Sequence, residues 1–155
     1  MALTFRGTDA NTLGLTFVRE GRTTSKRALR HMRRVSKLVM EQSIRNSPVD
    51  WKGYTSKDPP GHELEKSHRI VEQYGNGGRL EASVVVGGMV GDVDVDLYAE
   101  WLHEGVYNLG KASIAKQAGD PRARVGPQFL DNALRDHEDD FEPLLDELMN
   151  GLMGL

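Results

Sequence analysis

The chain has 155 residues, a formal net charge of −3, 38% hydrophobic residues and no cysteine. This length predicts one domain spanning residues 1–155, and the lack of cysteine excludes disulfides, zinc-thiolate sites and thiol nucleophiles. No apolar run approaches the roughly twenty residues of a membrane span, and the first residues lack a signal-peptide core. We therefore expect a chain that is made in the cytoplasm and enters no membrane.

The two halves of the chain differ in charge. Residues 1–75 contain 14 Lys and Arg against 8 Asp and Glu, whereas residues 76–155 contain 6 against 15. This asymmetry is compatible with head-to-tail contact between copies and with nucleic-acid binding. It is equally compatible with two oppositely charged, solvated faces on one monomer.

The first predicted elements are strands and a long helix. Residues 3–5 and 13–18 are rich in β-branched and aromatic residues, which predicts one or two strands. Met32, Val35 and Val39 then recur at helical spacing, which predicts a helix from about Ser25 to Arg45. Its other faces are basic and contain Lys26, Arg27, Arg30, Arg33, Arg34 and Lys37. Such a face is either solvated or binds nucleic acid, but no aromatic residue is interleaved for base stacking.

The helix is expected to stop before Pro48, since the residue preceding proline is biased out of the helical region. Residues 51–61 contain two glycines and two prolines, which predicts a long loop. This loop presents Trp51 and Tyr54. The two aromatic side chains either pack on the domain's own surface or contact a partner, because aromatic residues are enriched at interface centres.

A β-hairpin is predicted over residues 67–87, where apolar residues alternate on both sides of the Gly75-Asn76-Gly77-Gly78 turn. The turn lacks the Gly-Lys-Ser/Thr ending of a phosphate loop. Residues 92–96 alternate aspartate and valine, which predicts a further strand rather than a calcium loop, because Leu97 stands where such a loop needs glycine. The histidines are scattered and form no metal-binding pair, so we expect no metal and no cofactor.

Two short helices are predicted around a second long loop. Tyr98, Trp101 and Leu102 share one face of the first helix, and Gly105 is expected to end it in a left-handed conformation. The second helix is expected to begin at Gly126-Pro127, with proline in its first turn. We expect Trp101 to pack in the core with Tyr98, Leu102 and Phe129. The loop, residues 106–124, contains four basic residues that are predicted to contact the acidic half of another copy: Lys111, Lys116, Arg122 and Arg124.

Three separated segments share an order and a spacing: Pro48-Val49-Asp50, residues 98–105 and residues 127–134. Together they resemble one protein family, the small neck proteins of tailed bacteriophages, also called head-tail joining, minor tail or tail-completion proteins. The family shows Pro-Val-Asp-Thr-Gly, then Tyr-Ala-x-x-x-Glu-x-Gly, then Arg-Pro-Phe-Leu-x-x-Ala-Leu. Here Trp51-Lys52 and an inserted loop replace the Thr-Gly, and Gly126-Pro127-Gln128-Phe129 replaces Arg-Pro-Phe. The matching positions are Pro48, Asp50, Tyr98, Gly105, Pro127, Phe129 and Leu130, with Trp101 and Glu104 inside the second segment.

The resemblance implies an α+β fold, with a long N-terminal helix packed on an antiparallel sheet of about four strands, a short helix and a C-terminal helix. It implies a structural virion protein that forms a six- or twelvefold ring in the neck. The expected partners are portal or adaptor proteins on the head side and the tail terminator or tail tube on the tail side. DNA would pass through the lumen without sequence-specific contact.

The sequence is compatible with two other functions. The first is a small nucleic-acid-binding regulator that uses the basic helix, residues 25–45, and would show a steep salt dependence of duplex affinity. The second is a small hydrolase, but no nucleophile, base and orienting group can be placed from the sequence. We therefore expect no enzymatic activity.

Overall fold

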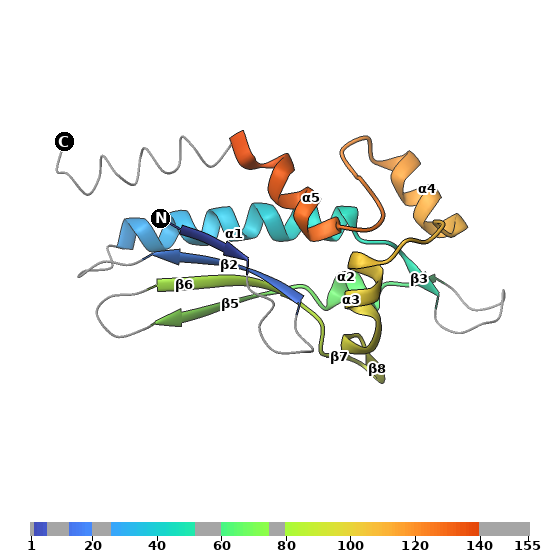
Figure 1. Ribbon diagram of the computed structural model, residues 1–155, viewed down its shortest axis with the longest axis horizontal. Coiled ribbons are helices and arrows are strands. Elements are labelled where there is room, and N and C mark those ends of the chain that lie inside the picture. Colours follow the sequence, from blue (N-terminus) through green and yellow to red (C-terminus); the bar gives the residue numbers. More distant parts are fainter. Residues whose placement is uncertain (1, 6–12, 20–25, 52–59, 75–79, 140–155) are drawn as a thin grey trace.

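The computed structural model describes residues 2–5, 13–19, 26–51, 60–74 and 80–139. Its elements form one elongated α+β unit, the class that the sequence predicts (Figure 1). The predicted hairpin turn at residues 75–78, Tyr54 and residues 140–155 lie outside the described residues. In this part of the chain, no helix is long and apolar enough to cross a membrane.

The main sheet has the strand order β1-β2-β6-β5 and is antiparallel throughout. Its strands are β1 (Ala2–Phe5), β2 (Leu13–Arg19), β5 (Arg69–Tyr74) and β6 (Leu80–Val86). The predicted hairpin is confirmed by the pairing of β5 with β6, which sets Ile70 opposite Val84. Ala82, Val84 and Val86 alternate along β6 and are buried in the core, as a period of two requires.

Helix α1 (Lys26–Asn46) packs against β5 and β6. Met32, Val35 and Val39 follow helical spacing and join the valines of β6 in one core. Helix α5 (Phe129–Asp136) packs on α1 and adds Phe129, Leu130 and Ala133 to the same core. These layers leave Arg30, Arg33, Arg34 and Lys37 of α1 at the surface.

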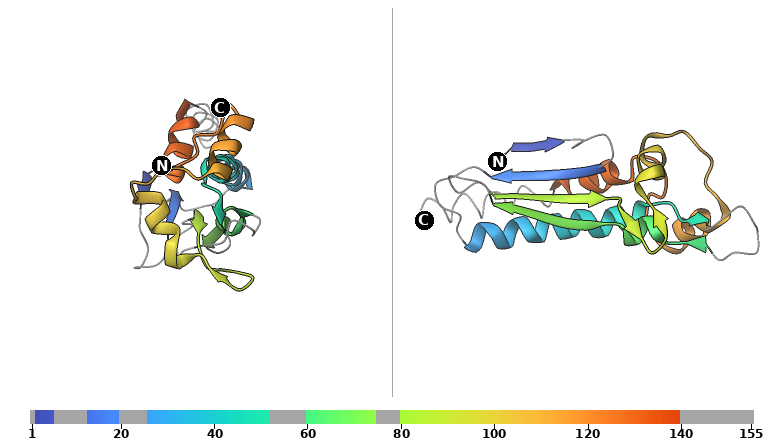
Figure 2. Two further views of the ribbon diagram at one scale, coloured as in Figure 1. Left: turned by 90° about the vertical axis from the view of Figure 1, so that its right-hand side faces the viewer. Right: turned by 90° about the horizontal axis from the view of Figure 1, so that it is seen from below.

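Smaller elements gather at one end of the long axis (Figures 1 and 2). They are the pair β3 (Asp50–Trp51) and β4 (Pro60–Gly61), α2 (Glu63–Lys66), the pair β7 (Met89–Val90) and β8 (Val93–Asp94), α3 (Asp96–Glu104) and α4 (Lys111–Gly119). The predicted strand over residues 92–96 is therefore wrong beyond Asp94. Val95 precedes the first turn of α3 and is fully buried, so the aspartate-valine alternation continues into a helix.

The stretch 106–124, predicted as a loop, contains helix α4. Ser113 on α4 is buried, and its hydroxyl contacts the backbone N–H and carbonyl of Val49 at 2.9 and 3.3 Å. The Pro48-Val49-Asp50 segment is thereby tied to α4, and Pro48 itself is buried. The expected loop at 51–61 begins and ends in the short β3-β4 pair, and its residues 52–59 lie outside the described part.

Two predicted helix boundaries are corrected. Gly105 has φ −72°, so it is not left-handed; glycine is needed because a Cβ there would collide with the carbonyl oxygen of Trp101. Pro127 precedes α5 instead of lying in its first turn, and Gln128 at the helix start has φ 55°. The backbone N–H of Gln128 donates to the carbonyl of His103 at 2.6 Å, so the end of α3 and the start of α5 are joined.

Candidate functional site

One face of α3 is turned to solvent over its whole length. Leu97 is 82% exposed and Trp101 60% exposed, and Glu100 and Glu104 are exposed beside them. Residues three, four and seven apart share one side of a helix, so these four side chains form a single strip. We call this strip, Leu97, Glu100, Trp101 and Glu104, the α3 outer face.

The opposite side of α3 packs through smaller side chains. Ala99 and His103 are buried, with His103 edge-on to Phe129 at a ring-centroid distance of 5.0 Å. Burial lowers the pKa of His103 from its ordinary value, while the carboxylates of Asp131 and Glu104 oppose this shift. Both ring nitrogens of His103 are buried without a hydrogen-bond partner among the described residues. The helix therefore meets the core on its Ala99 and His103 side.

The prediction that Trp101 belongs to the core is wrong. Its ring stacks on Tyr107 at a centroid distance of 5.3 Å, while Tyr98 and Leu102 pack against the core without it. The Tyr107 hydroxyl donates to the carbonyl of Leu102 at 2.7 Å, and burial raises the pKa of this phenol to about 12. The phenol thus remains a donor at neutral pH and fixes the ring against which Trp101 lies.

Further apolar side chains are exposed near this end of the molecule. Met89 on β7 is 64% exposed, and Val106, just after α3, is 100% exposed. The β7-β8 pair is joined to the start of α3, because the N–H of Gly88 donates to the Asp96 carboxylate at 2.8 Å and the N–H of Val95 donates to the Gly88 carbonyl at 3.1 Å. Exposed apolar groups on backbone that is fixed by hydrogen bonds are typical of protein interaction surfaces.

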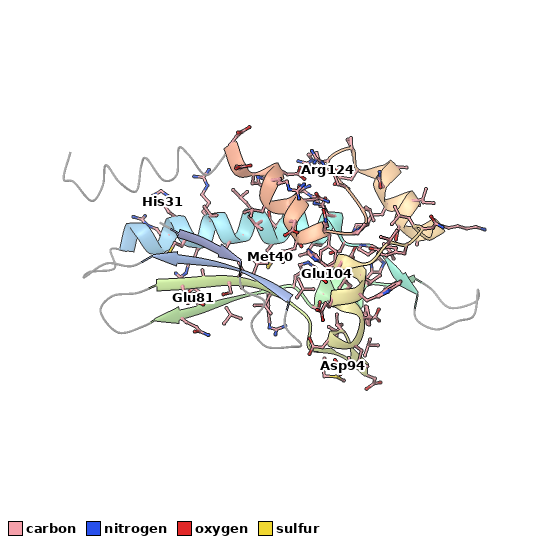
Figure 3. All side chains as sticks on the ribbon, in the orientation of Figure 1. His31, Met40, Glu81, Asp94, Glu104 and Arg124 are labelled. Carbon is pink, nitrogen blue, oxygen red and sulfur yellow. The ribbon has the colours of Figure 1, made fainter. Side chains whose placement is uncertain are left out.

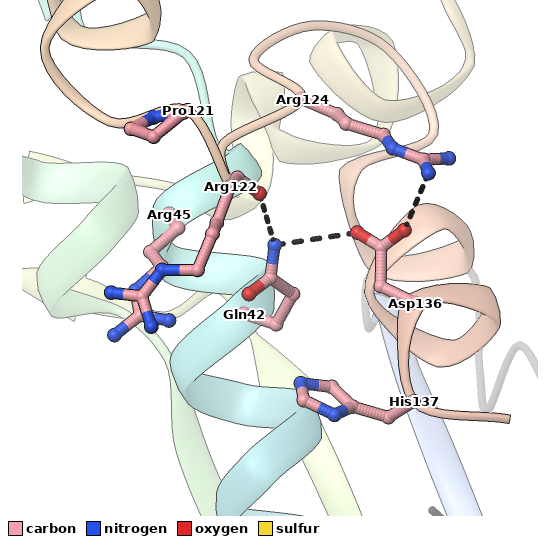
Figure 4. A pocket seen from close by; sticks show the side chains of 7 residues that line it. All are labelled: Gln42, Arg45, Pro121, Arg122, Arg124, Asp136 and His137. Carbon is pink, nitrogen blue, oxygen red and sulfur yellow. Dashed lines mark hydrogen bonds and ion pairs between the residues drawn. The ribbon is translucent and has the colours of Figure 1, made fainter. Parts of the chain in front are cut away.

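A cavity of about 340 Å³ lies between the end of α1, the segment before α5 and α5 itself (Figure 4). It brings together two of the predicted interface residues, Arg122 and Arg124. Arg124 pairs with Asp136 at 3.1 Å, and both Arg122 and Arg45 lie 3.7 Å from Asp120. The remaining lining residues are Gln42, Pro121 and His137. Each guanidinium therefore already has a carboxylate partner within the chain.

The buried side-chain amides of Gln42 and Asn46 form hydrogen bonds to the segment that lines this cavity. The Gln42 amide donates to the Arg122 carbonyl at 2.7 Å, and the Asn46 side-chain oxygen accepts from the Arg124 N–H at 2.8 Å. The backbone carbonyl of Asn46 accepts from the N–H of Gly126 at 3.1 Å. These contacts place the segment before α5 on the end of α1, so the cavity is part of the packing of the fold.

Lys116, predicted at an interface, is internal instead. Its side chain is 20% exposed, and its ammonium group donates to the carbonyls of Ile44 and Ser47, both at 2.7 Å, and to the Glu65 carboxylate. A cation at the last carbonyls of a helix satisfies unpaired acceptors and complements the helix dipole. Lys111, another predicted interface residue, is exposed at the first position of α4. Trp51 lies in β3, where the structure describes its backbone and not its side chain.

The basic strip of α1 is exposed in its N-terminal half, at Arg30, Arg34 and Lys37. Within the described residues, Arg30 and Arg34 have no ion-pair partner, whereas Arg33 pairs with Glu72 on β5 at 2.7 Å and Lys37 lies 3.7 Å from Glu41. We call Arg30, Arg34 and Lys37 the α1 basic strip.

A serine-histidine pair lies inside the fold. Ser43 donates to Nε2 of His68 at 2.9 Å, because Nδ1 of the same ring must donate to the Leu64 carbonyl, also at 2.9 Å. Ser43 is fully buried, and burial, together with the Lys116 charge, lowers the pKa of His68 to about 4 despite the two backbone hydrogen bonds and the Glu65 charge. Such a pair is out of reach of a substrate and weakly basic, so its role is packing.

Within the described ranges, no three His, Asp or Glu side chains gather where they could hold a metal ion. Searches of family models, curated proteins and solved structures find no match to this chain. Nothing in the sequence spacing singled out Leu97 or Tyr107 for this part of the surface, although Tyr107, the half-buried ring on which Trp101 stacks, lies only six positions after it.

Proposed function

We propose that this chain is a structural subunit of a tailed-bacteriophage virion, which forms a ring in the neck and joins the DNA-filled head to the tail. In this proposal a long helix lying on a four-stranded sheet is the repeated body of the ring. The head side contacts portal or adaptor proteins and the tail side contacts the tail terminator or tube. DNA passes through the lumen without being read.

The observation that carries the proposal is the α3 outer face. Leu97 and Trp101 are the exposed large apolar residues of α3, which also contains all of the Tyr98-to-Gly105 segment of the family resemblance except Gly105. A tryptophan that is 60% exposed and held by stacking on Tyr107 is suited to a subunit or partner contact, because large aromatic residues dominate interface energetics.

The charge distribution gives independent support. A ring built from heterologous contacts needs two different, complementary surfaces on each subunit. The α1 basic strip and the acidic residues of α3 provide two surfaces of opposite sign. Contact between copies should then weaken as salt screens these charges.

A second function is favoured by the same basic strip: a nucleic-acid-binding regulator would use Arg30, Arg34 and Lys37 on phosphates. The other basic residues of α1 favour it less, since Arg33 is paired with Glu72 and Arg45 lies near Asp120. Helix α1 contains no Phe, Tyr or Trp on which a base could stack.

The test is negative-stain imaging of the purified chain over a range of concentrations, alone and beside tailed particles. The proposal predicts closed rings with a central opening, of a diameter that matches the neck of the particles. Duplex binding is measured in parallel at several salt concentrations. Tight, steeply salt-dependent duplex binding by a chain that forms no ring would support the regulator and overturn the neck proposal.

A further inference from the structure

The α3 outer face and the α1 basic strip match in chemistry. The first has two apolar side chains, Leu97 and Trp101, beside two carboxylates, Glu100 and Glu104. The second has three cations on long aliphatic stems. Lys and Arg can lay their stems on apolar surface while the charged ends reach carboxylates, and Arg also stacks on the face of Trp.

The two surfaces also match in length. Arg30 to Lys37 and Leu97 to Glu104 are each separated by seven positions. At a rise of about 1.5 Å per residue, each surface therefore extends about 10 Å along its helix. The cations of the α1 basic strip and the carboxylates of the α3 outer face can thus be set side by side along two crossing helices.

Within one subunit the two surfaces are far from each other. Seen along the long axis, α1 and α3 lie on opposite sides of the molecule (Figure 2). His31, next to Arg30, and Glu104 are also well separated along the long axis (Figure 3). The surfaces therefore cannot meet in the same copy, but they are placed as the two sides of a heterologous contact.

We propose that the α1 basic strip of one copy docks on the α3 outer face of the next copy. This inference rests on the proposed function and specifies which surfaces close the ring. Trp101 and Leu97 form the apolar centre of the contact, and Glu100 and Glu104 pair with Arg30, Arg34 and Lys37. A partner of another kind on either surface is an alternative that the test below distinguishes.

The first arm of the test uses the absence of native cysteine. Leu97→Cys and Arg34→Cys are introduced singly and together, and the full chain is oxidised and run on a denaturing gel. The double variant should give a ladder of linked chains, whereas each single variant can give no more than a dimer. No ladder, at concentrations where the wild-type chain forms rings, would overturn the inference.

The second arm reverses charges. Arg30→Glu/Arg34→Glu and Glu100→Lys/Glu104→Lys should each weaken association about tenfold or more in sedimentation velocity. An equimolar mixture of the two reversed variants should associate again, because the acidic α1 of one meets the basic α3 of the other. Lys66→Glu and Glu138→Lys, exposed residues on other elements, are the matched controls and should behave as the wild type.

The outcomes separate the inference from the proposed function. Rings that persist in both reversed variants overturn this contact while the neck proposal stands. Loss of duplex binding in Arg30→Glu/Arg34→Glu, with association unchanged, assigns the strip to nucleic acid and overturns the inference. A wild-type chain that does not associate, together with a double-cysteine variant that forms no ladder, overturns both.

Discussion

The C-terminal half of α1 and the α3 outer face both contain polar and charged side chains, but they differ in where their partners come from. At the end of α1, Gln42 and Asn46 are buried, Lys116 of α4 is 20% exposed, and all three bond to groups of the same chain. On α3, Glu100 and Glu104 are exposed beside Leu97 and Trp101. In the first region the domain pairs its buried polar groups with hydrogen-bond partners of its own. In the second, apolar and charged side chains are exposed and accessible to another molecule.

The largest expected effect separates two aromatic residues. Phe129 is fully buried in the core, so Phe129→Ala should cost about 3 to 5 kcal/mol of unfolding free energy. Trp101→Ala, at a 60% exposed position, should cost about 1 kcal/mol or less while weakening association. Urea denaturation of both variants measures the difference. Equal losses would mean that the α3 outer face also belongs to the core.

The next effect is a loss of stability in acid that arises at His68, which is hydrogen-bonded to Ser43 of α1. Burial holds the pKa of His68 at about 4 in the folded chain, below its ordinary 6.5, so the unfolded chain takes up a proton first as pH falls. Stability is fully present above pH 6.5 and declines by about 3 kcal/mol as pH approaches 4. Burial of His103 acts in the same direction.

Unfolding free energies measured between about pH 7 and pH 4.5 check this prediction. His68→Gln should remove most of the slope, whatever its effect on stability at neutral pH. His62→Gln, at an exposed histidine, is the matched control and should keep it. A slope that survives in His68→Gln would place the acid sensitivity elsewhere in the chain.

A smaller effect is expected for Lys116, the lysine of α4 that contacts the end of α1. Lys116→Met leaves the carbonyls of Ile44 and Ser47 and the Glu65 carboxylate without this donor, which should cost about 2 kcal/mol, since the site is partly open to solvent. Lys111→Met, at an exposed position of the same helix, should change stability by about 0.5 kcal/mol or less. Indistinguishable melting curves for the two variants would contradict the internal role of Lys116.

The smallest effect is expected at the cavity. Arg124 is 65% exposed, so its pair with Asp136 should contribute less than about 0.5 kcal/mol, and Arg124→Ala should be nearly neutral for stability. The same substitution should leave association unchanged if copies meet through α1 and α3. Weakened association would move the contact toward the arginines of the cavity.

Periodicity predicted the elements that bury one clear face. The spacing of Met32, Val35 and Val39 indicated a helix at 25–45, close to the 26–46 of α1, and alternation indicated β5 and β6. Helix α4 could have been found from its three alanines and the glycine at its end. It was missed because its amphipathic pattern is weak and its one buried side chain is a serine.

The site was harder to predict than the fold. In α3, the large residues suggested one buried face, but the helix packs through Ala99 and His103, so spacing alone assigned Trp101 to the wrong side. The internal position of Lys116 could not be predicted from the sequence either, because its acceptors, the carbonyls of Ile44 and Ser47, are 72 and 69 positions earlier in the chain. Contacts of this kind depend on tertiary placement, which local pattern does not encode.

The Lys116 contact has a consequence for the order in which the chain folds. Lys116 lies 72 positions after Ile44 and 69 positions after Ser47, so the contact spans the hairpin, α2 and α3. Contacts between such distant positions form late, because the entropy of closing the intervening chain is lost before they contribute. During synthesis α1 leaves the ribosome well before its terminal carbonyls meet their donor. In refolding followed by pulsed amide exchange, the end of α1 should therefore gain protection after its middle.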